Sequence, residues 1–222
     1  MAATQFVVIA STVVIFILSS VLAAYMTKDY LRKKTLSPLF WSIGLWLFAL
    51  GVALESFFAA GVYSEFLIGM YLFIVAALVN SLAIGSIMLI KNKAIKTIYY
   101  IFSVVSLAFL LISVFTSRIG NVMITYVVAG VLPLSVITSS SLVTGPAAVI
   151  LVVVALKSYL STKDKKMLSI IAGVVVVSVA GGLYIAAFPA FLYYSEFIGV
   201  LLLWIGFFRF NVSKKNIRPK RS

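Results

Sequence analysis

Long apolar stretches recur along this chain at lengths that match the thickness of a membrane. A transmembrane helix needs about 20 predominantly apolar residues. Apolar side chains make up 64% of this chain, against about half of a typical soluble domain. Seven stretches of the required length cover residues 6–26, 39–60, 66–90, 98–116, 138–156, 167–188 and 190–208. The sequence therefore predicts an all-α integral membrane protein, in which residues 1–210 form a seven-transmembrane helix bundle.

The distribution of basic residues predicts how this bundle is oriented. Lys and Arg close to the ends of spans are retained on the cytoplasmic side. If the N-terminus lies outside, the links after the first, third and fifth spans and the C-terminal tail all lie in the cytoplasm. These segments contain every one of the 18 basic residues except Arg118. The chain is therefore expected to be a multi-pass protein of the cell membrane, with its N-terminus outside and its C-terminus cytoplasmic.

The basic tail, residues 211–222, admits two interpretations. It could bind a nucleic acid or a protein partner, or it could anchor the topology beside anionic lipid headgroups. Lys and Arg next to a span are attracted to the anionic inner leaflet, which favours the anchor. We therefore expect contact with the lipid bilayer and no binding of nucleic acid.

Residues 121–137 are apolar enough to suggest an additional span. An eighth span would place the basic link 157–166 outside and would destroy the charge pattern. β-Branched and aromatic residues at 122–128, followed by turn residues at 130–133, favour a short external β-hairpin or a re-entrant segment. Backbone at membrane depth must satisfy its own hydrogen bonds, so this apolar external segment should lie on the bundle, where it could form a lid.

Two carboxylates lie inside predicted spans, where ionisable residues are costly and often functional. By the helical rise, Glu55 stands about 24 Å from the inner end of the second span, and Glu196 about 9 Å from the outer end of the seventh. Both are therefore expected at similar depth, towards the outside. Small residues mark close contacts between membrane helices. Each carboxylate shares its helix face with two glycines, so both should face other helices: Gly44 and Gly51, and Gly199 and Gly206.

Other polar groups join these carboxylates in a candidate ligand-binding pocket that opens outward. Asn80 lies near the middle of the third span, on a face with small residues. Gly145 and Pro146 predict a break in the fifth span and are hinge candidates, since proline removes a backbone donor. The candidate ligand-binding residues are Glu55, Asn80, Glu196, Ser140, Ser141, Thr144 and, on the rim with other tyrosines, Tyr194.

A simpler interpretation of the same residues stays open. Each carboxyl could reach an interfacial water or a tyrosine hydroxyl, and the tyrosines could form the usual aromatic belt. If Glu55 and Glu196 do share a dry site, the two like charges favour holding a proton there, which would suit proton coupling.

The chain has no His and no Cys. It therefore lacks imidazole and thiol nucleophiles, the His ligand of many haems and the usual zinc ligands. No Walker A, GxSxG or HExxH motif is present, so we expect no enzymatic activity, cofactor or metal. Microbial rhodopsins share the seven spans and the external N-terminus but attach retinal to a Lys in the last span. Residues 190–208 contain no Lys, which excludes a retinal pigment.

One segment resembles a known family. The basic run Arg32, Lys33 and Lys34 precedes residues 40–55, in which a Trp, Gly and Ala-Leu-Glu pattern ends at Glu55. This pattern resembles the basic link and second helix of the seven-span sensor modules at the N-termini of some bacterial and archaeal histidine kinases and diguanylate cyclases. The match covers about a tenth of the chain, which ends about a dozen residues after Phe208. The resemblance implies a prokaryotic, stand-alone ligand-sensing bundle that signals to another protein through its cytoplasmic links and tail.

Three functions are consistent with these features. A sensor or ligand-binding protein for a small molecule fits the polar pocket and the resemblance. A small proton-coupled transporter fits the carboxylates, but no inverted repeat is evident and the inner half of the bundle lacks charge. An accessory subunit of a larger membrane complex fits a chain with so few reactive groups.

Overall fold

A computed structural model describes residues 2–119, 123–124, 127–128, 132–163, 169, 172–173, 176 and 194–205. Within these residues the chain is almost entirely helical. The labelled elements are α1 (Ala2–Lys33), α2 (Leu36–Ala59), α3 (Glu65–Ile87), α4 (Lys93–Thr116), β1 (Met123–Ile124), β2 (Val127–Val128) and α5 (Leu134–Thr162). Each of these five helices is long and apolar enough to cross a membrane, and a shorter apolar helix covers Tyr194–Ile205. The chain is therefore a helical, multi-pass membrane protein.

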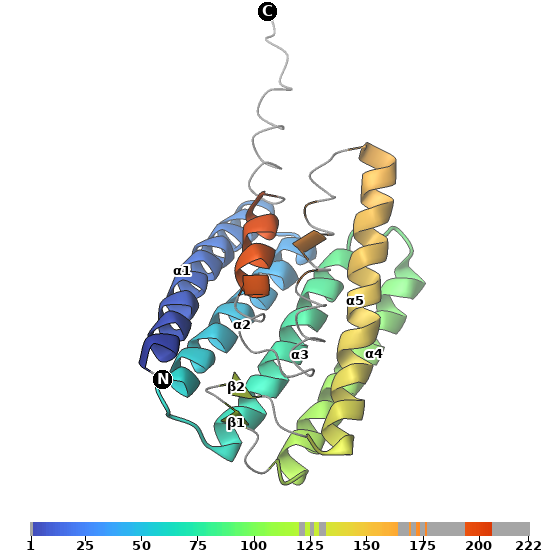
Figure 1. The fold of residues 1–222 in the computed structure, drawn as a ribbon. Helices are drawn as coiled ribbons and strands as arrows, with labels where there is room; N and C mark the ends of the chain where they lie inside the picture. The colour runs from blue at the N-terminus through green and yellow to red at the C-terminus, as the bar shows by residue number, and fades with distance from the viewer. Residues whose placement is uncertain are drawn as a thin grey trace, which may run out of the picture.

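The long helices alternate in direction and pack side by side (Figure 1). α3 is the central helix, because it contacts α2, α4 and α5, and α1 packs against α2 on one side of the bundle. α4 shows how each helix divides its faces. Its outward face carries exposed Ile98, Ile101, Val105 and Ile112, which suits contact with lipid tails, whereas serines lie on its buried face.

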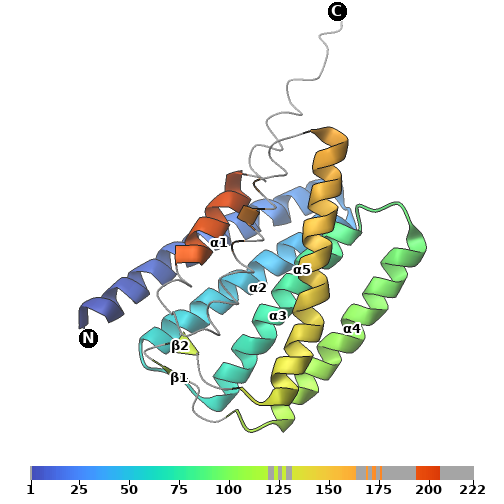
Figure 2. The ribbon, with the colours of Figure 1, turned by 45° about the vertical axis from the view of Figure 1, so that its right-hand side comes forward.

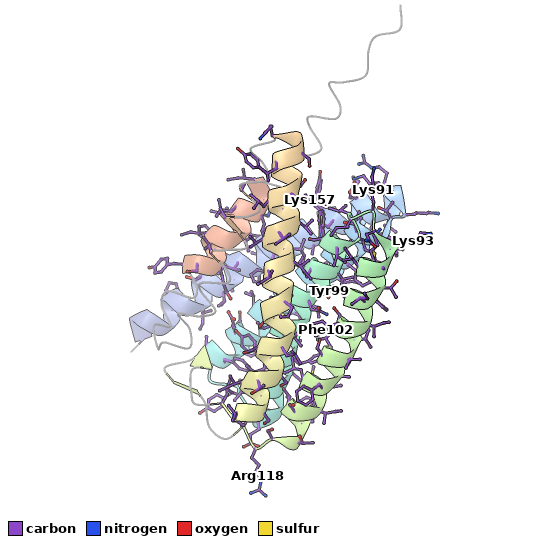
Figure 3. All side chains as sticks on the ribbon, turned by 90° about the vertical axis from the view of Figure 1, so that its right-hand side faces the viewer. Lys91, Lys93, Tyr99, Phe102, Arg118 and Lys157 are labelled. Carbon is purple, nitrogen blue, oxygen red and sulfur yellow. The ribbon has the colours of Figure 1, made fainter. Side chains whose placement is uncertain are left out.

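Basic residues gather at one end of the bundle (Figure 3). Lys91, Lys93 and Lys157 project at that end, and Arg118 projects at the other. α1 ends in Arg32 and Lys33 at the same end as the α3–α4 link (Figure 1). The charge asymmetry in the sequence is therefore an asymmetry between the two ends of the folded bundle.

The first five predicted spans each correspond to one long helix, with boundaries that local interactions extend. α1 continues past residue 26 to Lys33, because Asp29 pairs with Arg32 at 2.9 Å and with Lys33, one turn away. α4 begins at Lys93 rather than at 98, because the Asn92 side chain accepts hydrogen bonds from the backbone N–H groups of Ala94 and Ile95. The sixth predicted span lies largely outside the described residues, as does the tail 211–222. Of the seventh, Tyr194–Ile205 is helical.

The predicted external segment divides into two parts. β1 and β2 pair in antiparallel register, Met123 with Val128 and Ile124 with Val127, which is the geometry of the short hairpin. The last four residues of the segment instead belong to α5, which begins at Leu134 directly after Pro133. β2 contacts α2, and Figure 2 shows the strand pair at the end of the bundle opposite the basic end. Whether this segment acts as a lid stays a prediction.

Glycines allow α2 and α3 to approach closely. A Cβ atom on Gly44 would lie 2.8 Å from Leu82 Cδ2 and 3.1 Å from the carbonyl oxygen of Leu78, both on α3. Gly85 of α3 lies beneath the indole of Trp41, which donates to the carbonyl of Leu82 and to the hydroxyl of Ser86, both at 3.2 Å. The small-residue face of α2 therefore packs against α3, as the sequence predicts.

The helix Tyr194–Ile205 packs against α1 and α2. Val200, 1% exposed, is buried with Ile15 of α1 and Val52 of α2. Trp204 donates its indole N–H to the carbonyl of Leu18 in α1 at 3.1 Å. This position brings Glu196, near the start of the same helix, to the end of α2 that carries Glu55.

Candidate functional site

Glu55 is buried near the end of α2 that lies opposite the basic end of the bundle. Only 6% of its surface is exposed, although Phe57, two residues later, is 54% exposed. Tyr71 of α3 donates its hydroxyl to Glu55 Oε1 at 2.6 Å. The ring of Tyr71 meets Phe58 edge to face, with centroids 5.6 Å apart. α2 and α3 together therefore hold one oxygen of this carboxyl in a fixed position.

Glu196 supplies the second carboxyl. It is 7% exposed, and it lies one turn from Val200, which is buried against Val52, itself one turn from Glu55. Within the described residues, the Oε2 atoms of both side chains are buried without a hydrogen-bond partner. Residues far apart in the sequence thus form a carboxyl pair with two unused acceptors.

The chemistry of the carboxyl pair follows from its surroundings. Two carboxylates in contact away from water repel each other, and burial without compensation adds to the cost. Tyr71 contributes a neutral donor and no positive charge. The pair therefore favours occupants that carry a positive charge or donate hydrogen bonds. No group of three or more potential metal ligands occurs in the described part of the chain.

Asn80 belongs to a separate polar centre between α3 and α4. It is 1% exposed, and its Oδ1 accepts from the hydroxyls of Tyr99 at 3.1 Å and Ser103 at 2.9 Å. Its Nδ2 has no partner among the described residues. Asn80 lies nine residues after Tyr71, about 14 Å along α3. The structure therefore divides the predicted polar cluster into two centres, and the carboxyl pair does not include Asn80.

The hydroxyls of α5 do not join the carboxyl pair either. Ser140 and Thr144 are half-buried and Ser141 is exposed. Thr144 donates to the carbonyl of Ser140 within the same helix at 2.9 Å. Ser139, in the same run of hydroxyls, is fully buried, and it also bonds within α5.

The structure also places two further predicted positions. Tyr194 is 65% exposed at the start of its helix, whereas Glu196 two residues later is buried. α5 continues without interruption through Gly145 and Pro146, so the expected break in the fifth span is absent. Half-buried Pro146 thus lies inside a regular helix, and a hinge at these residues stays a prediction.

The partners of Asn80 are the residues that the sequence analysis missed. They lie on α4 in a stripe with helical spacing, in which each member is buried: Tyr99, Ser103, Ser106, Leu110 and Ser113. Four polar residues on one face of an otherwise apolar helix could have been recognised from this spacing. Their partner on α3 could not, because spacing within one helix does not determine which helix it faces.

Replacing Asn80 by leucine is expected to lower the free energy of unfolding by about 1–3 kcal/mol, because the hydroxyls of Tyr99 and Ser103 lose their common acceptor. Equilibrium unfolding in detergent measures this loss. Adding Tyr99→Phe and Ser103→Ala should restore part of it, since no buried donor then remains unpaired. Thr116→Val, an exposed change on the same helix, is the control. A loss equal to the control's would show that the Asn80 centre does not stabilise the bundle.

Comparison of the chain with protein-family models, with curated proteins and with solved structures finds no match. No relative therefore assigns an activity to the carboxyl pair. Its function has to be inferred from its own geometry and chemistry.

Proposed function

We propose that this chain is a sensor or ligand-binding protein of the cell membrane, and that it receives its ligand at the carboxyl pair. The observation that supports this proposal is the burial of both Glu55 and Glu196 on helices that pack together at Val52 and Val200. Such residues inside a membrane protein are costly to keep and commonly mark a ligand or ion site. Because one oxygen of each carboxyl has no partner among the described residues, the pair favours a ligand that donates hydrogen bonds or carries positive charge.

In this proposal the bundle has seven spans, its N-terminus lies outside, and its carboxyl pair faces outward. The basic end of the bundle is then cytoplasmic, since Lys and Arg are retained there. Glu55 lies four residues before the end of α2, at the end of the bundle opposite Lys91 and Lys157. The β1–β2 pair lies at that same end, beside α2. The resemblance of residues 32–55 to seven-span sensor modules supports the same function, with a partner protein reached through the cytoplasmic links.

A screen for small molecules that raise the unfolding temperature of the purified protein tests this proposal. A ligand present at 100 times its dissociation constant should stabilise the protein by about 2.7 kcal/mol. Glu55→Gln and Glu196→Gln should abolish this stabilisation. Glu65→Gln, the same change at an exposed carboxyl, should leave it intact. Stabilisation that survives both buried substitutions would place the ligand elsewhere and would overturn the proposal.

A small proton-coupled transporter is the second candidate, because buried carboxyls within a membrane are also the chemistry of proton relays. Reconstitution into liposomes separates the two functions. Substrate flux that disappears in Glu55→Gln would favour the transporter. An accessory subunit would instead co-purify with a stoichiometric partner and tolerate both substitutions.

A further inference from the structure

We propose that the Asn80 centre between α3 and α4 is a binding site for an internal water molecule, which accepts a hydrogen bond from Asn80 Nδ2. This site is separate from the carboxyl pair and does not depend on the proposed function. Asn80 is 1% exposed, and the hydroxyls of Tyr99 and Ser103 donate to its Oδ1 at 3.1 and 2.9 Å. The centre is therefore a well-defined polar site inside an apolar bundle.

Only half of the hydrogen-bonding capacity of Asn80 is used within the described residues. A carboxamide has two acceptor sites on its oxygen and two N–H donors on its nitrogen. The two hydroxyls occupy both acceptor sites, whereas Nδ2 is buried and has no partner in that part of the chain. Buried donors are costly to leave unpaired, and the bilayer core has no bulk water that could satisfy them. The centre therefore requires a hydrogen-bond acceptor beside Nδ2.

The described side chains around this centre do not supply that acceptor. Asn80 lies seven residues before the last residue of α3, about 10 Å from the nearer end of the helix. Tyr99 lies on the side of α4 that faces α3 and α5 (Figure 3). It belongs to a cluster of buried residues whose other members are apolar: Ala83, Ile84, Ile87, Ala147 and Leu151. A bound molecule is therefore the source of the acceptor that we propose.

The chemistry of the centre selects water as this molecule. Ser103 and Ser106 are 1% and 2% exposed, so the ligand must be small. The four polar side chains are uncharged, and an ion buried without a counter-charge is costly, so the ligand must be neutral. The hydroxyls of Tyr99 and Ser103 donate their protons to Asn80 but can still accept. A water that accepts from Nδ2 and donates to these oxygens would make the roughly three hydrogen bonds that are typical of buried waters.

Hydroxyl-radical footprinting by X-ray irradiation tests for this water in the full-length protein in lipid nanodiscs. Radicals form from water where it is bound, so a side chain beside an internal water is oxidised even when it is buried. We therefore expect oxidation of Tyr99, which is 7% exposed. Met26 has a more reactive side chain but is 4% exposed among apolar residues, and it should be protected. Equal protection of Tyr99 would show that Nδ2 is unpaired or bonded to another part of the chain, and would overturn the proposal.

Two variants show whether this oxidation depends on Asn80. Asn80→Leu should lose it, because leucine fills the space of the amide and offers no donor to a water. The triple variant Asn80→Leu/Tyr99→Phe/Ser103→Ala removes the hydroxyls that would lose their acceptor, so it serves if the single variant does not fold. Its aromatic ring at position 99 should also be protected. Thr116→Val, an exposed change on α4, should retain the wild-type pattern. Oxidation at position 99 that persists in a folded Asn80 variant would overturn the proposal.

Discussion

A protein that carries both Glu55→Leu and Glu196→Leu is expected to lose much less stability than the two single variants lose together. Each single change removes one buried carboxyl and leaves the other one buried. An unsatisfied buried polar group costs about 1–3 kcal/mol. The double variant leaves no buried carboxyl, because leucine fills the space with apolar atoms. Glu55→Leu should be the costlier single change, since it also removes the acceptor of the Tyr71 hydroxyl.

Equilibrium unfolding of the four proteins in detergent completes a thermodynamic cycle. The coupling free energy between the two sites should lie in the range of about 0.5–3 kcal/mol that is typical of residues in contact. Glu65→Leu with Glu196→Leu provides the matched control, and these two changes should be additive within about 0.5 kcal/mol. Additivity of Glu55→Leu and Glu196→Leu would show that the two carboxyls do not interact in the folded protein.

Gly85→Ala is expected to destabilise the contact between α2 and α3 by about 1–3 kcal/mol, the usual cost of overpacking. The new methyl group would lie 2.7 Å from Trp41 Nε1 and 3.0 Å from the carbonyl oxygen of Ser37. A rigid indole and a backbone atom cannot both give way without moving α2. The same shift would weaken the hydrogen bonds from Trp41 to Leu82 and Ser86. Tryptophan fluorescence during unfolding measures both the stability and the environment of this ring.

Gly145→Ala is the matched control for this prediction. A Cβ atom on Gly145 would have no neighbour within 4 Å, and the residue lies inside α5. Alanine is favoured over glycine in a helix by up to about 1 kcal/mol. The control should therefore be neutral or stabilising. Equal effects of the two substitutions would show that Trp41 does not pack over Gly85 in the folded protein.

Membrane thickness explains why the sequence predicts the long helices so well. The requirement for about 20 apolar residues defines α2 and α3 to within a few residues. The errors fall at helix ends, where polar side chains decide the boundary and hydropathy gives no information. Asn92 caps α4, which begins five residues before its predicted start, and the ion pairs of Asp29 extend α1.

The candidate site could be predicted only in part, for a different physical reason. Helical spacing correctly indicated that Glu55 and Glu196 face other helices, because glycines share their faces. It could not indicate whether Asn80 joins them, since the rotation of α3 about its axis decides whether Asn80 faces α2 or α4. The structure shows that Tyr71 contacts α2 and that Asn80 contacts α4. The single polar cluster that the sequence predicts therefore divides into two centres in the folded protein.

The carboxyl pair joins residues that are synthesised 141 positions apart. At about 5–20 residues per second, Glu55 emerges on the order of 10 s before Glu196. During this interval the nascent protein can already form the hydrogen bond from Tyr71, which is encoded only 16 residues after Glu55. Tyr71 can thus satisfy one oxygen of the Glu55 carboxyl while the later helices are still being inserted into the membrane. Glu55 and Glu196 can come together only after the helix Tyr194–Ile205 has packed against α1 and α2.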